Sequence, residues 1–387
     1  MDKTSLDALL GRAVADHAIP GVVAVIADRN GLLYEQAFGV RDTATGAPMV
    51  LDTIFRIASM TKLVTALSVL QQVERGVVAL DTPVGDVLPE FDALPVLDGF
   101  DGDRPRLRRP KSRATLRQLL NHTSGLAYDI WNHGLARYEA ITKHPRLGSG
   151  LRLALTSEPL VSDPGTRFNY GTSMDWAGLV VEALTGQRLE TYWQEKFFDP
   201  LGMKDTVVHL DPGRRVRTTP VHARDGAGAW RPTSINFAVD PEFYPGGHGL
   251  HSTAADYMIL QQSLLHEGKS PAGPLLQPDT IAAMLSNQLG PLDVGTIVSA
   301  RPDESLDITL HGMQWGLGLL LDTADVPGGR AAGSAGWMGG FNTFFWVDRR
   351  RGMTAAFYTQ TLPFYDTAIM DTYRRFETAA YATAPAA

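Results

Sequence analysis

The stretch Ser59–Lys62, which reads Ser-Met-Thr-Lys, opens a predicted helix that runs from Ile57 to Gly76. Apolar residues recur along it at helical spacing, and Gly76 is a typical C-terminal stop. Residues three apart on a helix are neighbours, so Lys62 should reach back to the Ser59 hydroxyl. The sequence therefore predicts a hydroxyl and an amine side by side at the start of a buried helix.

This pair of groups has a specific chemical use. A serine hydroxyl is a weak nucleophile until a base takes its proton. Lysine is ordinarily protonated at neutral pH, but burial and the positive end of the helix dipole both disfavour the ammonium form. The same dipole, together with the Ser59 backbone N–H, would help to hold an oxyanion. A serine N-cap followed by a lysine that extends to solvent accounts for the same four residues equally well.

Composition narrows the class of protein. The chain has 387 residues, of which 44% are hydrophobic and 20% charged, as in a globular protein with room for two subdomains. A net charge of −7 argues against nucleic acid or an anionic membrane as a partner. Cysteine is absent, which excludes disulfides, thiolate metal sites and a cysteine nucleophile. The N-terminus predicts an amphipathic helix from about Ser5 to His17 rather than a leader, so we expect a cytoplasmic protein.

The two ends of the chain carry the strand-like sequences. Gly21–Asp28 and Leu32–Gly39 flank an Arg-Asn-Gly turn that is typical of a hairpin. Further strands are expected at 315–322, 341–348 and 353–360, before a last amphipathic helix from about 365 to 382. These segments predict one antiparallel sheet with flanking helices.

Helical patterns and long loops dominate the middle of the chain. The clearest helices are Leu116–Asn121, Asp175–Thr185, Leu189–Phe198, Ala254–His266 and Pro278–Ser286. The arginine-rich run 104–117 is expected to be a solvated loop rather than an anion site. The predicted fold class is α/β of the α+β type. Residues 1–58 and 305–387 would form a discontinuous α/β domain, and residues 59–304 a mostly helical domain with the Ser59 helix at the interface.

Two further segments carry groups that could act beside the serine. The turn-rich segment Asp163–Thr172 leads into a helix and places Tyr170 at the junction, where its phenol could relay a proton if a cation stabilises the phenolate. A tyrosine that anchors a loop is the more common arrangement. The glycines of 333–340 would let a substrate approach the backbone, so that an N–H such as that of Gly340 completes an oxyanion hole. They could instead form a tight turn.

Other motif classes are missing. The sequence has no G-x-S-x-G, H-E-x-x-H, Walker A or G-x-G-x-x-G motif, so neither a cofactor nor a metal is expected. His122, His248 and His251 lie in glycine- or serine-containing loops and could line a cleft, although each alone is more typical of a structural residue.

The order of these features resembles a known family. Ser59-x-x-Lys62, then Tyr170 after a Pro-Gly turn, then a glycine-rich strand start at Trp337 resemble the serine β-lactamase and penicillin-binding-protein superfamily, in particular its class C-like branch. The segments 116–126 and 246–255 are similar to other recurrent segments of that family. The resemblance thus extends over almost the whole chain and implies a β-lactamase/transpeptidase-like fold.

The resemblance also implies roles for individual residues. Ser59 would be acylated, Lys62 and Tyr170 would share the proton transfers, and the backbone N–H groups of Ser59 and Gly340 would form the oxyanion hole. Which of Lys62 and Tyr170 is the resting base stays open, because two coupled groups titrate as a pair. Substrate contacts are expected from Trp337, Met338, Gly339, Tyr128, Thr172 and His248.

Two departures from the family pattern bear on the substrate. Tyr170-Gly171-Thr172 lacks the asparagine of the usual Tyr-x-Asn, and Trp337-Met338-Gly339 replaces the usual Lys-Thr-Gly. The cation that would meet a β-lactam or peptide carboxylate is therefore missing, which costs on the order of 1.5–3 kcal/mol of binding. A Trp-x-Gly at this point looks like the family VIII carboxylesterases.

The leading hypothesis is a serine carboxylesterase that cleaves short-chain esters through an acyl-enzyme on Ser59, with a small-molecule ester as its partner. The alternatives within the superfamily are a β-lactamase, a D-amino-acid amidase or peptidase, and an acyltransferase. A sensor that is acylated without turnover is the alternative from a different class. The sequence leaves the physiological ester, the enantioselectivity and the oligomeric state open.

Overall fold

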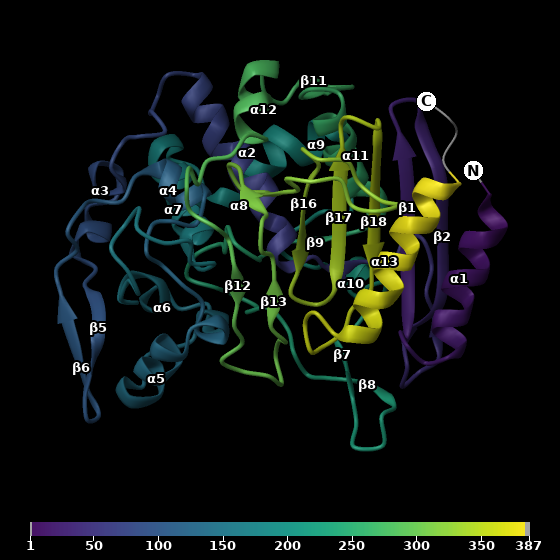
Figure 1. The fold of residues 1–387 in the computed structure, drawn as a ribbon, viewed down its shortest axis with the longest axis horizontal. Helices are drawn as coiled ribbons and strands as arrows, with labels where there is room; N and C mark the ends of the chain where they lie inside the picture. The colour runs from purple at the N-terminus through teal and green to yellow at the C-terminus, as the bar shows by residue number, and fades with distance from the viewer. Residues whose placement is uncertain (1, 384–387) are drawn as a thin grey trace.

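One antiparallel sheet of eight strands forms one half of the molecule, and its strands come from both ends of the chain (Figure 1). The computed structural model describes residues 2–383, so residues 1 and 384–387 of the expected α/β domain lie outside the described residues. The order across the sheet is β14-β15-β16-β17-β18-β1-β2-β3. These strands are β1 (Gly21–Asp28), β2 (Gly31–Asp42), β3 (Ala47–Pro48), β14 (Gln314–Trp315), β15 (Leu320–Leu321), β16 (Ala335–Gly339), β17 (Thr343–Asp348) and β18 (Met353–Tyr358).

Helices cover both faces of this sheet, which explains why its central strands are apolar along their whole length. On one face, α1 (Lys3–Ala15) and α13 (Thr367–Ala382) lie side by side (Figure 1). On the other face lies α11 (Ala254–Leu265). Successive side chains of a strand point to opposite faces, and accordingly Phe344 stacks on Tyr373 of α13 while its neighbour Phe345 packs on Tyr257 of α11.

Two strand predictions at the C-terminal end need correction. The single strand expected at 315–322 is two short strands, β14 and β15, that pair with each other. Gly318 lies between them at φ +96°, where a side chain would also press on Ala66, so the chain turns there. The glycine-rich segment before 341 is itself the strand β16, and it turns at Asn342 into β17, which begins at Thr343 rather than at residue 341.

The other half of the molecule is mostly helical and surrounds the helix α2 (Thr61–Glu74), which a short 3₁₀ turn at Ala58–Met60 precedes. α2 packs against α7 (Ser173–Thr185), which in turn packs on α4 (Leu116–Leu120). The remaining helices are α3 (Val84–Val87), α5 (His133–Thr142), α6 (Leu153–Thr156), α8 (Leu189–Trp193), α9 (Asp199–Leu201), α10 (Pro212–Arg215) and α12 (Pro278–Met284). The helix expected at 189–198 is α8 followed by a π-helical turn at Gln194–Phe198.

Short two-stranded ribbons complete the described chain. They are β4 (Phe55–Arg56) with β9 (His251–Ser252), β5 (Val96–Asp101) with β6 (Arg104–Arg108), β7 (His222–Arg224) with β8 (Trp230–Pro232), β10 (Lys269–Ser270) with β11 (Gly273–Pro274), and β12 (Thr296–Ile297) with β13 (Ile308–Thr309). The arginine-rich run therefore starts as a strand and not as a loop. Its later arginines pair with aspartates, as Arg108 does with Asp163 at 2.8 Å. No helix within residues 2–383 combines the length and the apolar character needed to cross a bilayer.

The start of α2 lies where the two halves meet. The edge of the sheet comes so close to it that a Cβ added at Gly339 of β16 would collide with the carbonyl oxygen of Ile57. This close approach puts Ser59 beside the residue that follows β16, Gly340.

We expect Gly339→Ala to destabilise the protein, because the added methyl group forces β16 away from the backbone at Ile57. Overpacking of this kind costs about 1–3 kcal/mol. Gly340→Ala is the matched control, since a Cβ there has no atom within 4 Å. Thermal unfolding of the two variants should show a lower midpoint for Gly339→Ala alone, and equal midpoints would contradict the close approach.

Candidate active site

The sequence-predicted pair is in contact at the start of α2. Lys62 Nζ lies 3.0 Å from Ser59 Oγ. The residue before the serine, Ala58, has φ +42°, a left-handed conformation that costs a non-glycine residue about 1–2 kcal/mol. Ser59 is 9% exposed and Lys62 is fully buried, so the hydroxyl lies nearer to solvent than the amine. The lysine does not extend to the surface as an ordinary helical lysine would.

Burial controls the charge of Lys62. It lowers the pKa of the ammonium to about 7, although the nearby Asp175 carboxylate acts in the opposite direction. Nζ also lies 2.8 Å from Gly247 O and 3.1 Å from Tyr128 Oη. A large fraction of the lysine is therefore a neutral amine at neutral pH, and a neutral amine has a lone pair that can take a proton from Ser59.

Tyr170 lies beside this pair but has a different character. Its Oη accepts a hydrogen bond from Trp337 Nε1 at 2.8 Å, and its ring lies 4.8 Å from Lys62 Nζ. Burial raises the pKa of Tyr170, and the Ser59 hydroxyl and the Trp337 indole only partly offset it. Tyr170 is thus a protonated phenol at neutral pH, and the phenolate considered from the sequence is disfavoured.

An aromatic cluster holds Tyr170 in place. The rings of His122, Trp131, Trp315 and Trp337 lie around it at centroid distances of 4.8, 5.3, 6.1 and 5.0 Å. Trp337 is 4% exposed, and its indole points to Tyr170. Trp337, an expected substrate contact, is therefore not on the cavity wall and supports Tyr170 from behind instead.

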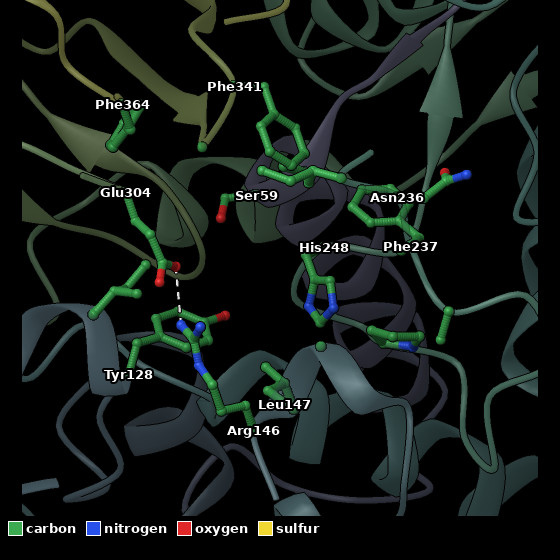
Figure 2. Close-up of a pocket in the computed structure, with 18 of the residues that line it drawn as sticks. Ser59, Tyr128, Arg146, Leu147, Asn236, Phe237, His248, Glu304, Phe341 and Phe364 are labelled. Carbon is green, nitrogen blue, oxygen red and sulfur yellow. Dashed lines mark hydrogen bonds and ion pairs between the residues drawn. The ribbon is translucent and has the colours of Figure 1, made fainter. Parts of the chain in front are cut away.

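A cavity of about 610 Å³ opens in front of Ser59 (Figure 2). Gly340, the residue expected to supply the second oxyanion N–H, lies on its wall. Two of the expected substrate contacts, Tyr128 and His248, lie there as well. Figure 2 shows Ser59 and His248 both pointing into the central space. Most of the remaining wall is apolar: Ile130, Trp131, Leu147, Val208, Ile235, Phe237, Ala238, Pro241, Pro245, Phe341, Leu362 and Phe364.

The charged groups of the cavity are largely paired with one another. Arg146 is the one lysine or arginine among the described wall residues, and its guanidinium donates to Asp129 and Glu304 at 2.9 Å each (Figure 2). A substrate carboxylate would therefore find no unpaired cation among them. The missing strand lysine inferred from the sequence has no replacement in this wall.

Besides Trp337, three more residues that were expected to touch substrate do not line the cavity. The Thr172 hydroxyl donates to Glu158 Oε2 at 2.8 Å, and both side chains are buried. Met338 points to the other face of β16, toward a separate cavity of about 250 Å³ under α13. Gly339 instead allows the close approach to Ile57. Of the other histidines, His122 and His251 are buried and lie off the cavity wall.

Two residues that the sequence reasoning missed complete the site. Gly247 supplies the carbonyl oxygen nearest to Lys62 Nζ, and its own N–H donates to Asp175 Oδ1 at 3.0 Å. Asp175 is fully buried in the first turn of α7. A lone acid within the apolar stretch 174–181 was the available signal, but an acid in the first turn of a helix is also ordinary.

Comparisons with known proteins match almost the whole chain to one family. A family model described as Beta-lactamase matches residues 6–380. Monacolin J acid methylbutanoyltransferase from Aspergillus terreus is 36% identical over 396 residues, which cover 96% of this chain and 94% of the relative. Esterase EstB from Burkholderia gladioli is 32% identical over 385 residues, which cover 92% of this chain and 90% of the relative. The unliganded selenomethionyl structure of simvastatin synthase (LovD) from Aspergillus terreus matches with a TM-score of 0.85 and 33% identity, covering 100% of this chain and 99% of that one.

The pKa of Lys62 predicts a pH profile. If the neutral amine is the base, kcat/KM for ester hydrolysis should rise with pH to a plateau, with a midpoint near 7. Below this midpoint it should fall about tenfold for each pH unit. Lys62→Arg should lower kcat/KM by about 10²–10⁴-fold at every pH, because a guanidinium stays protonated. Lys204→Arg, at an exposed lysine, is the control. A profile that is flat from pH 5 to 9 would contradict the assignment of the base.

Proposed function

The chain belongs to the beta-lactamase family, and we propose that within it this protein is a serine carboxylesterase whose nucleophile is Ser59. Esterase and acyltransferase relatives support a serine acyl-transfer or hydrolase activity. The observation that carries the narrower proposal is the contact of Ser59 Oγ with a buried lysine amine, at the base of a mostly apolar cavity.

The proposed acylation uses the groups in contact with Ser59. The Lys62 amine takes the hydroxyl proton while Oγ attacks the ester carbonyl carbon. The N–H groups of Ser59 and Gly340 stabilise the resulting oxyanion. The intermediate then expels the alkoxide, which takes the proton from the Lys62 ammonium and leaves as the alcohol. Tyr170, a protonated phenol beside Oγ, would share this transfer as a hydrogen-bond donor.

The second half of the cycle repeats these steps with water. Water gives a proton to the Lys62 amine as its oxygen attacks the acyl carbon, and the Ser59 oxygen regains that proton when the acyl bond breaks. The carboxylic acid then leaves the cavity. Every proton that Lys62 accepts is returned within the same half-reaction, so the enzyme ends in its starting state.

The proposed substrates are uncharged esters. The wall is mostly apolar, and its described arginine is already paired with two carboxylates. A β-lactam or a peptide would bury its carboxylate without a partner, which is unfavourable by on the order of 1.5–3 kcal/mol. An ester also leaves as an alkoxide, which needs less protonation than the amine of an amide.

A second candidate function is acyl transfer to an alcohol instead of water. The relative from Aspergillus terreus is named a methylbutanoyltransferase. A cavity of about 610 Å³ also has room for more than a short acyl chain, since ligand pockets of about 300–1,000 Å³ hold drug-sized molecules. An acceptor alcohol could therefore lie beside the acyl-enzyme and compete with water.

Ser59→Ala should abolish hydrolysis of p-nitrophenyl butyrate, because no other group can form the acyl-enzyme. The variant should keep the far-ultraviolet circular dichroism and the melting temperature of the wild type, since it removes one oxygen from a side chain that is 9% exposed. Full activity in this variant would refute the proposal. A wild type that forms a stable adduct on Ser59 and releases no acid would instead identify an acylating sensor.

Adding an apolar alcohol to the wild-type reaction separates the two candidate functions. A transferase should form the new ester in preference to the free acid even when the alcohol is far more dilute than water. An esterase should yield mainly the acid. Mass-spectrometric quantification of both products from one vinyl butyrate reaction measures this ratio directly.

A further inference from the structure

A buried carboxylate outside the proposed catalytic set is linked to Lys62 by two routes. Asp175 Oδ1 accepts the Gly247 N–H, and the carbonyl of the same glycine faces Lys62 Nζ. The second route passes through Tyr128, whose Oη lies 3.1 Å from Nζ. A Cβ added at Gly247 would lie 2.6 Å from Asp175 Oδ2 and 2.8 Å from Tyr128 Oη, so these two oxygens face the same space. Within residues 2–383, Oδ2 has no hydrogen-bond partner, so this buried oxygen is an acceptor without a donor.

The hydrogen atoms of a neutral amine can be assigned from these neighbours. Nζ then has two N–H groups and one lone pair. Gly247 O can only accept, so it takes one N–H at 2.8 Å. Tyr128 Oη can either accept the second N–H or donate its own hydrogen to the lone pair. Only the first arrangement leaves the lone pair free for the Ser59 proton.

Asp175 decides between these two arrangements. A carboxylate accepts hydrogen bonds and donates none, so it attracts the Tyr128 hydroxyl hydrogen to its own side. After burial, the charge of Asp175 is the largest influence that raises the pKa of Tyr128, so the phenol keeps this hydrogen. The lone pairs of Tyr128 Oη then face Nζ and accept the second N–H.

We propose that Asp175 and Tyr128 are positioning residues that act through Lys62, holding its lone pair toward Ser59 in the resting enzyme. This inference rests on the proposed function, because it takes Ser59 as the nucleophile. It also selects Lys62 over Tyr170 as the resting base, which the sequence left open.

Asp175 is also the anion that acts on the Lys62 charge. The other titratable groups around the pair are His122 and Tyr170 beside Lys62, His248 with Nδ1 3.5 Å from Asp175 Oδ1, and Glu158 behind Thr172. Burial lowers the pKa of His122 and raises those of Tyr170 and Glu158, which favours the neutral form of each of the three. Removing the Asp175 charge should therefore move the titration of Lys62 to lower pH.

The test measures the rate of acylation, as the burst of p-nitrophenol from p-nitrophenyl butyrate between pH 5 and 9. Asp175→Asn replaces an acceptor oxygen by an amide that can donate to Tyr128, which would turn the phenol hydrogen toward Lys62. We expect acylation to be slower by about tenfold to a hundredfold, part of the general-base contribution, and its pH midpoint to lie below that of the wild type. Tyr128→Phe should slow acylation as well, and adding Asp175→Asn to it should cause little further loss at the pH plateau.

Glu158→Gln is the matched control. Glu158 is also a buried carboxyl group of the helical half. Burial raises its pKa well above the usual range and so favours the protonated acid, which the amide resembles. We expect its acylation rate and pH midpoint to match those of the wild type.

Three results would overturn the inference. The first is wild-type acylation in Asp175→Asn, and the second is slower acylation with an unchanged midpoint, which a merely structural role would give. The third is a wild-type rate of acylation in Tyr128→Phe. This variant removes a single oxygen, so it decides the question if Asp175→Asn does not fold. The proposed function itself fails in a different way, since the wild type would then show neither a burst nor an adduct on Ser59.

Discussion

The site depends on the burial of one lysine. An ammonium group that is taken fully out of water loses its hydration. Lys62 has no direct ion pair to compensate this loss within the described residues, so burial lowers its pKa to about 7. The neighbouring groups are a carbonyl, a phenol and a hydroxyl, which suit an amine as well as an ammonium. The buried carboxylate of Asp175 stays one group removed from the amine, behind Gly247. A direct contact would have restored the charge and removed the base.

This requirement explains why the site lies where the two halves of the fold meet. The helical half supplies the groups around Lys62, because Tyr128, Tyr170 and Asp175 come from α7 and the loops beside it. The sheet supplies Gly340 at the end of β16, and Gly339 lets that strand approach the backbone before Ser59. Neither half contains the complete set. The position of β16 therefore couples the stability of the sheet edge to the geometry of the proposed oxyanion hole.

The sequence was most informative where the geometry is local. The spacing of Ser59 and Lys62 predicts their contact directly, because residues three apart on a helix are neighbours. The apolar runs in the sequence likewise predicted the buried strands β1 and β18. The predictions failed where distant segments decide the outcome. Gly318, at φ +96°, turns the expected strand at 315–322. A side chain at this position would meet Ala66 of α2, and the local sequence does not reveal that neighbour.

Trp337 shows how one substitution changes two properties of the site. The sequence indicated that a tryptophan in place of the family's strand lysine removes a cation from the substrate site, and the described cavity wall has no unpaired replacement. Its indole, however, points to Tyr170 and not into the cavity. An indole N–H is neutral, so it stabilises a phenolate at Tyr170 less than a lysine ammonium would, and burial keeps the pKa of Tyr170 high. With Tyr170 protonated, Lys62 is the proposed acceptor of the Ser59 proton. The change that is proposed to favour uncharged esters therefore also supports the proposed assignment of the base.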